Sequence, residues 1–173
     1  MSDLSTHVLI GIDPGYDACG FAVIHGTPGN IKIKEFGIIK TCRTERIESR
    51  LHELRCGLLE ILRIHCIREA AVEELFFNLN KKTAVKVAQA RGVILELLFE
   101  QKITVCEYAP STVKKALTGS GSAKKVHVQK SAAILTGLKT IPRQDDAADA
   151  LAVGITHLFY LQQNQQIKTH RKK

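Results

Sequence analysis

The stretch VLIGIDPG at residues 8–15 joins a short apolar run to a dense turn signal. Apart from one glycine, residues 8–12 are β-branched or aliphatic, and such a run is typical of a buried strand. The strand is expected to stop at Asp13, because the proline and the glycine that follow are strong turn residues. A carboxylate therefore stands at the very end of a strand that is otherwise apolar.

Two further strand signals follow this turn. Residues 19–24 form a second β-rich run, and residues 31–41 alternate apolar and polar side chains over most of their length. Between the two runs, Gly26, Pro28, Gly29 and Asn30 mark a turn. Three strands joined by short loops predict an antiparallel meander.

The pattern then changes to a helical period. Apolar residues recur every three or four positions from Ile47 to Leu62, with charges between them, which predicts an amphipathic helix. The remaining expected elements are a strand at 70–77, a helix at 82–99, a strand at 103–108, a helix at 110–117, a helix reaching about residue 135 and a helix at about 145–161. The predicted fold class is α/β, with a five-stranded mixed sheet and helices on both of its faces. Two of the five strands are added to the meander through helical crossovers.

Length and composition predict one domain at residues 1–161, because 173 residues with 45% hydrophobic content can bury a substantial core. Residues 162–173 have little apolar content and end in three basic residues, so we expect a basic, disordered tail.

The formal net charge of +8 favours a polyanionic partner, although charge alone is explained equally well by a basic surface that serves solubility. Five scattered cysteines without a CxxC pair indicate reduced thiols rather than a disulfide framework or a zinc site. No apolar run reaches the roughly 18 residues of a membrane span. We therefore expect a soluble, cytoplasmic protein with no membrane partner.

Four carboxylates stand out by their places in these elements. Asp13 ends the first strand, Glu73 lies in the fourth, and Asp146 and Asp149 share one face at the start of the last helix. If the fourth strand lies beside the first, all four acids approach one another. Buried like charges raise one another's pKa, and a divalent cation can compensate them. An oxygen-only ligand set favours Mg²⁺ or Mn²⁺, and two such ions can catalyse phosphodiester hydrolysis.

The acids also have simpler explanations. Asp13 precedes a proline and a glycine, so it could be only a turn residue. Asp145 and Asp146 could be only helix N-cap residues. Glu73 is harder to explain in this way because it interrupts an apolar run, and strand alternation places Glu74 on the opposite face.

Together these motifs closely resemble the RuvC family of Holliday-junction resolvases, which have the ribonuclease H-like fold. The resemblance covers nearly all of residues 8–160. The stretches that carry it are GIDPG with the later Gly20 (11–20), AVEELFF (71–77), AVKVAQARGV (84–93), GSGSAKK (119–125) and DDAADALAVGITH (145–157).

This resemblance implies a metal-dependent crossover junction endodeoxyribonuclease that cuts symmetric strands of four-way DNA junctions during recombination and repair. Matching the family motif position by position places its catalytic, metal-binding acids on Asp13, Glu73, Asp146 and Asp149. It implies two Mg²⁺ ions in each active site, with Mn²⁺ as a substitute.

The resemblance also implies roles in DNA binding and assembly. Phe76 matches an aromatic residue that stacks on an unpaired base, although regular strand alternation would place it in the core, on the face opposite Glu73. Lys114 and Lys125 match basic residues that approach the scissile phosphate. The helix carrying AVKVAQARGV resembles the one that forms a homodimer contact, and a branch-migration motor complex is an implied partner. The roles of Asp145 and of Lys124 stay open.

Three other classes stay in view. A strand followed by Asp-x-Gly also begins actin-like and sugar-kinase folds, but those need two related domains and a second phosphate loop, which 173 residues scarcely contain. A ribonuclease H-like enzyme acting on RNA or on ordinary duplexes is the second class. A DNA-binding module whose acids are decayed or purely structural is the third, and the presence of all four acids argues against decay.

Overall fold

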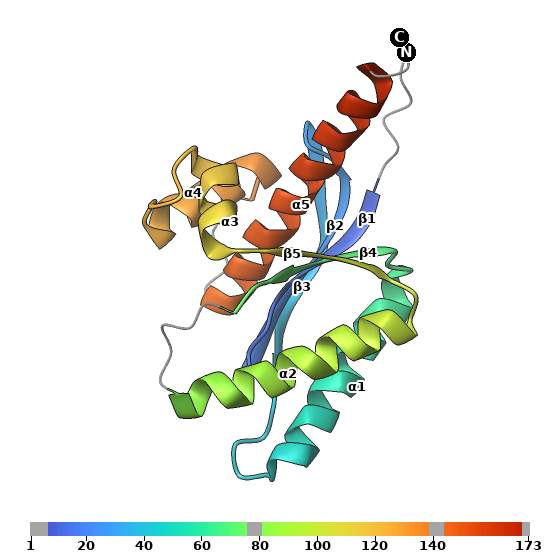
Figure 1. Ribbon diagram of the computed structural model, residues 1–173, viewed down its shortest axis with the longest axis vertical. Helices are drawn as coiled ribbons and strands as arrows, with labels where there is room; N and C mark the ends of the chain where they lie inside the picture. The colour runs from blue at the N-terminus through green and yellow to red at the C-terminus, as the bar shows by residue number, and fades with distance from the viewer. Residues whose placement is uncertain (1–6, 76–80, 139–143, 171–173) are drawn as a thin grey trace.

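The computed structural model describes residues 7–75, 81–138 and 144–170 (Figure 1). Its strands are β1 (His7–Asp13), β2 (Ala18–Thr27), β3 (Asn30–Lys40), β4 (Glu69–Glu73) and β5 (Thr104–Tyr108). They form one sheet in the order β3-β2-β1-β4-β5. β2 pairs antiparallel with β1 and β3, whereas β4 lies parallel to both β1 and β5. The predicted mixed sheet, a meander extended by two crossover strands, is confirmed.

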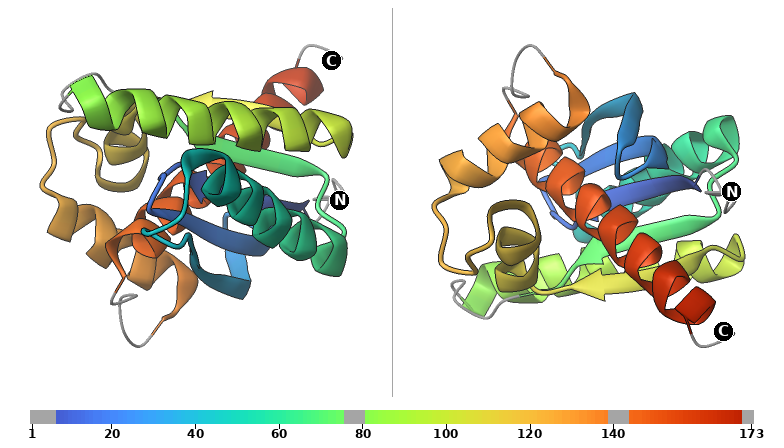
Figure 2. Two further views of the ribbon diagram at one scale, coloured as in Figure 1. Left: turned by 90° about the horizontal axis from the view of Figure 1, so that it is seen from below. Right: turned by 90° about the horizontal axis from the view of Figure 1, so that it is seen from above.

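Helices cover both faces of this sheet, as predicted (Figure 2). They are α1 (Ile47–His65), α2 (Lys81–Glu100), α3 (Pro110–Thr118), α4 (Lys125–Thr136) and α5 (Asp145–His170). The pair α1 and α2 lies over one face, and α5, flanked by α3 and α4, lies over the other. Within the ranges described above, no helix combines the length and the hydrophobicity that a membrane crossing requires.

Strand alternation divides the core into two layers. Ile10 and Ile12 of β1 are fully buried in the layer that contains Leu58 of α1, whereas Leu9 is fully buried in the layer that contains Leu151 of α5. Burying each such side chain contributes roughly 1.5–3 kcal/mol. β1 is therefore covered on both faces, which explains why its sequence is an almost uninterrupted apolar run.

Glycines let α5 lie directly on the strands. A Cβ atom at Gly11 would lie only 2.1 Å from the main-chain oxygen of Ala150, and one at Gly20 would lie 2.0 Å from that of Asp146. A Cβ atom at Gly154 would lie 3.4 Å from the Cα atom of Gly11. Main chain thus packs against main chain, and this contact brings the first turns of α5 over the end of β1.

β4 is shorter than the sequence predicts, because it ends at Glu73 and not at residue 77. Its neighbours end at the same level: β1 stops at Asp13 and β5 at Tyr108. The main-chain nitrogen of Glu74 still donates to the main-chain oxygen of Tyr108 at 2.9 Å, but neither neighbouring strand continues past this level to extend the ladder. Phe76 lies outside the described residues, so its predicted role is untested by this structure.

The last helix is longer than predicted and continues through His170 instead of ending near residue 161. The expectation of a disordered tail is therefore wrong for residues 162–170, and residues 171–173 lie outside the described part. Low apolar content suggested disorder, but this segment is rich in glutamine and contains neither glycine nor proline. Elongating an existing helix with such residues costs little free energy.

The contact between α5 and β1 can be tested with Gly11→Ala. Because the added methyl group would overlap the main-chain oxygen of Ala150, the free energy of unfolding should fall by about 2–3 kcal/mol in a urea titration. Gly29→Ala is the matched control, since a Cβ atom there has nothing within 4 Å, and it should change stability by less than about 0.5 kcal/mol. Equal stability of the two variants would contradict the close approach.

Candidate active site

Asp13 and Glu73 are the last residues of two neighbouring parallel strands. The register of β1 and β4 pairs Ile12 with Val72, so the next residue on each strand is one of these acids. The two carboxyl groups lie close enough that the side chain of Asp13 counteracts the raised pKa of Glu73. The sequence predicts Asp13 at a strand end and Glu73 inside a strand; in the structure both residues end their strands, and the sheet brings them together.

The first two turns of α5 add Asp146 and Asp149 to this edge of the sheet. Both interact electrostatically with Asp13, and Asp149 also interacts with Glu73. The contact of the main chain of Asp146 with Gly20 of β2 sets how closely the helix approaches. The four acids singled out from the sequence therefore converge from three elements.

Burial and mutual repulsion oppose ionisation of this cluster. Burial, followed by the charges of Glu73, Asp149 and Asp146, raises the pKa of Asp13 from 3.8 to about 8. Burial and the charge of Asp149 raise the pKa of Glu73 from 4.5 to about 7. Burial also raises the pKa of Asp149. Carboxyl groups that resist ionisation in this way create a strong local preference for a bound cation.

Lys125 and Lys114 supply positive charge to the cluster. Nζ of Lys125, at the start of α4, donates a hydrogen bond to Oδ2 of Asp149 at 2.7 Å. Burial lowers the pKa of this ammonium group, but the hydrogen bond and charge of Asp149 outweigh burial and raise it. The charge of Lys114, on α3, counteracts the raised pKa of Glu73. Lys125 thus contacts one of the four acids, and the charge of Lys114 acts on another.

Asp145 lies at the rim of the cluster and not inside it. Its side chain is 72% exposed, and its Oδ2 lies 3.6 Å from Nζ of Lys125. The main-chain oxygen of Gln144 accepts the hydrogen bond of Ala148, which gives Gln144 the N-cap position of α5. Asp145 and Asp146 are therefore first-turn residues, where the helix dipole favours negative charge.

Two hollows flank the acids, and both are lined by Glu73 and Pro110. The first is completed by Val113, Lys114, Lys125, Val128, Asp149 and Ala152. The second is completed by Asp13, Pro14, Gly15, Ala18, Glu74, Leu75, Val87 and Asp146. A ligand can therefore reach the carboxylates from two sides, one lined by acids and two lysines and the other lined by acids without a lysine.

A buried histidine helps to hold α5 in place. Nδ1 of His157 lies 2.8 Å from the hydroxyl of Tyr108 on β5, and its Nε2 lies 3.1 Å from Oε2 of Glu69 on β4. The helix that carries Asp146 and Asp149 is thereby tied to two strands. The only sign of this contact in the sequence is a histidine placed two helical turns after Asp149 in an apolar stretch.

Comparison with known proteins agrees with this geometry. The family described as "Crossover junction endodeoxyribonuclease RuvC" matches residues 9–157. RuvC of Treponema pallidum (strain Nichols) is 40% identical over 157 residues, which cover 91% of this chain and 80% of that protein. RuvC of Rubrobacter xylanophilus is 42% identical over 152 residues, covering 88% of this chain and 85% of that protein.

Solved structures extend the likeness to three dimensions. Thermus thermophilus RuvC, solved in complex with a Holliday junction substrate, matches with a TM-score of 0.87 and 34% identity, covering 91% of this chain and 96% of that chain. The yeast mitochondrial Holliday junction resolvase matches with a TM-score of 0.70 and 12% identity, covering 95% of this chain and 82% of that chain, a likeness of fold alone. The ribonuclease H-like fold expected from the sequence is confirmed. The chain belongs to the RuvC family of crossover junction endodeoxyribonucleases.

Proposed function

We propose that this protein resolves four-way DNA junctions by divalent-metal-dependent hydrolysis of phosphodiester bonds. The observation that carries the proposal is the convergence of four carboxylates, with lysines beside them, at one edge of a ribonuclease H-like sheet. Membership of the RuvC family and the relative solved with a Holliday junction support the substrate. The net charge of +8 suits a polyanion.

The acid cluster fits a divalent metal by its chemistry. Its donors are hard carboxylate oxygens, and burial penalises their negative charge unless a cation compensates it. Asp13, Glu73, Asp146 and Asp149 would hold two Mg²⁺ ions, with Mn²⁺ able to replace them. In the side-chain positions seen here, the described residues include no group of three or more His, Cys, Asp or Glu that could hold a metal ion. Metal binding would therefore require small side-chain shifts, including release of Asp149 by Lys125.

The bound metal would supply an activated water and stabilise the leaving oxygen. The protein's own side chains would align the DNA. Lys114 and Lys125 line one hollow beside Glu73 and are placed to bind the oxygens of the scissile phosphate. The hollows on both sides of the acids leave room for the strand to continue past the cleavage point.

Cutting symmetric strands of one junction requires two active sites, so we propose a homodimer. Exposed apolar side chains on α2 support this helix as the contact, since Val85 is 61% exposed and Phe99 is 83% exposed. Base stacking by Phe76 and work beside a branch-migration motor rest on the family resemblance. We place the protein in the cytoplasm, where its DNA substrate would lie.

Asp13→Asn and Glu73→Gln test the catalytic assignment. Each change removes a negative charge from the metal site but leaves the lysines, so cutting of a synthetic four-way junction should fall at least about a hundredfold. Junction affinity, measured without metal by gel shift, should stay close to wild type.

Glu74→Gln is the matched control for these variants. Glu74 follows Glu73 directly but is exposed, and it should retain most of the cutting activity. Near wild-type cutting by Asp13→Asn or Glu73→Gln would overturn the assignment. Linear duplex, single strand and RNA–DNA hybrid, tested beside the junction, distinguish a resolvase from other ribonuclease H-like nucleases.

The raised pKa of Asp13 predicts how pH acts on the metal-free protein. Because the pKa of about 8 in the folded state exceeds the ordinary value of 3.8, the stability linked to this group is fully present below pH 3.8. It is lost as pH rises through about 8. At pH 8, Asp13→Asn should therefore melt higher than wild type by about 5 °C, whereas at pH 4 the two should melt alike.

The informative quantity is the difference between the two melting curves at each pH, since this difference cancels titrations elsewhere in the protein. Adding Mn²⁺ at pH 8 should raise the melting temperature of wild type much more than that of Asp13→Asn. A difference that does not change between pH 4 and pH 8 would contradict the burial of an ionisable Asp13.

A further inference from the structure

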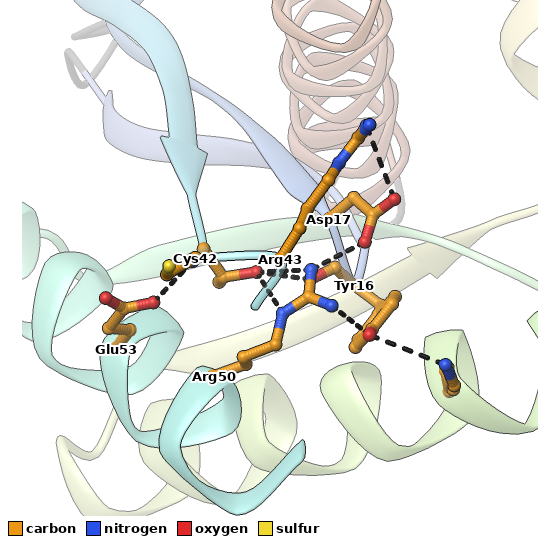
Figure 3. Close-up of polar contacts among 8 residues, drawn as sticks. Tyr16, Asp17, Cys42, Arg43, Arg50 and Glu53 are labelled. Atoms are coloured by element: carbon orange, nitrogen blue, oxygen red, sulfur yellow. Dashed lines mark hydrogen bonds and ion pairs between the residues drawn. The ribbon is translucent and has the colours of Figure 1, made fainter. Parts of the chain in front are cut away.

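Arg50 is a buried cation outside the acid cluster, in the first turn of α1. Its side chain is 3% exposed. Nε donates to Oγ1 of Thr41 at 2.9 Å, and Nη2 donates to Oδ1 of Asp17 at 2.5 Å (Figure 3). Nη1 donates to the hydroxyl of Tyr16. A buried guanidinium needs such partners, and here they all come from outside its own helix.

These partners hold the loop between β1 and β2, which begins directly after Asp13. Tyr16 and Asp17 form the second half of this loop. Oγ1 of Thr41 donates to the main-chain oxygen of Tyr16 at 2.9 Å. The main-chain nitrogen of Thr41 donates to the main-chain oxygen of Asp17 at 3.2 Å. The carbonyl groups of Tyr16 and Asp17 are thus both bonded to Thr41, whose side chain is bonded to Arg50.

The loop is stiff enough to transmit this restraint to Asp13. Pro14 has a fixed φ angle, and a Cβ atom at Gly15 would lie 1.7 Å from the main-chain oxygen of Ala18, so the chain folds back on itself closely. Three neighbouring acids repel the Asp13 carboxylate. A movement of the loop would therefore displace the Asp13 carboxylate, whose position is already opposed by this repulsion.

Tyr16 also connects this loop to α2. The Cζ atom of Arg50 lies 3.7 Å from the centre of the Tyr16 ring, and Nζ of Lys86 lies 4.8 Å from it. The same ammonium group lies 3.5 Å from the Tyr16 hydroxyl. Cations stack favourably on aromatic rings, so Tyr16 joins α1, α2 and the loop in one contact.

We propose that Arg50 is a positioning residue for cleavage: by holding Tyr16, Asp17 and Thr41, it keeps the Asp13 carboxylate where the metal binds. This inference rests on the proposed function, in which Asp13 is a metal ligand. A merely structural role, in which Arg50 only fastens α1 to the sheet, would lower stability without changing metal affinity.

Arg50→Lys tests the proposal because it keeps the charge but loses the planar set of donors. Arg55→Lys is the matched control: Arg55 lies on the same helix and pairs with Glu96 and Glu100 of α2. Three readouts are needed on full-length protein. They are the affinity for Mn²⁺ alone by calorimetry, kcat and KM for junction cutting, and amide hydrogen exchange of residues 14–18.

Arg50→Lys should weaken Mn²⁺ binding about tenfold and lower kcat by a similar factor, while KM for the junction stays near wild type. Exchange at residues 14–18 should become faster. Arg55→Lys should leave Mn²⁺ affinity, kcat and loop exchange unchanged. Tyr16→Phe keeps the ring but removes the hydroxyl that Arg50 and Lys86 contact, so it should shift all three readouts in the same direction by a smaller factor.

If Arg50→Lys does not fold, Tyr16→Phe decides the question alone. Wild-type Mn²⁺ affinity and kcat in a folded Arg50→Lys or Tyr16→Phe variant would overturn the proposal, and so would equal losses in Arg55→Lys. Failure of wild type to bind Mn²⁺ or to cut junctions would instead remove the proposed function. Loop exchange would then decide whether Arg50 holds the loop, with unchanged exchange rejecting the restraint.

Discussion

Asp13 and Glu73 end two adjacent parallel strands, and the pairing of these strands forces their carboxyl groups together at a buried edge. Burial raises the pKa of Asp13 to about 8 and that of Glu73 to about 7, and repulsion among the acids adds to both: the charge of Glu73 acts on Asp13, and the charge of Asp149 acts on Glu73. A protein without use for such a pair would gain stability by replacing either acid with an apolar residue. The rest of the site is arranged around this repulsion, through the charges of Lys114 and Lys125 and through the network that holds the loop behind Asp13.

The second determinant is the close packing of α5 on the sheet. Gly11 and Gly20 have no side chain that would keep the helix away, and this absence lets main chain touch main chain. His157 adds polar contacts to β4 and β5, which fix the helix along and across the strands. A helix held in this way presents Asp146 and Asp149 to the other two acids with little freedom. The packing of the core and the electrostatics of the site are therefore parts of one arrangement.

Local sequence patterns were sufficient to predict most of this molecule. Hydrophobic period distinguished strands from helices, and Asp13 and Glu73 stood out because they end or interrupt apolar runs. The end of β4 was not predictable, because it depends on where β1 and β5 stop and not on the apolar run in β4 itself. The low apolar content of residues 162–170 predicts disorder, but their helix propensity, that of glutamine above all, lets α5 continue through His170. The contacts of Arg50 were invisible because Thr41 and Tyr16 belong to other elements.

The central claim, that the four acids form a divalent-metal site, is tested most directly by anomalous diffraction from crystals soaked in Mn²⁺. We predict anomalous peaks within about 2.1 Å of carboxylate oxygens of Asp13 and Glu73, with Nζ of Lys125 moved away from Asp149. Crystals that show no peak at these acids at saturating Mn²⁺, with Lys125 still bound to Asp149, would contradict the account.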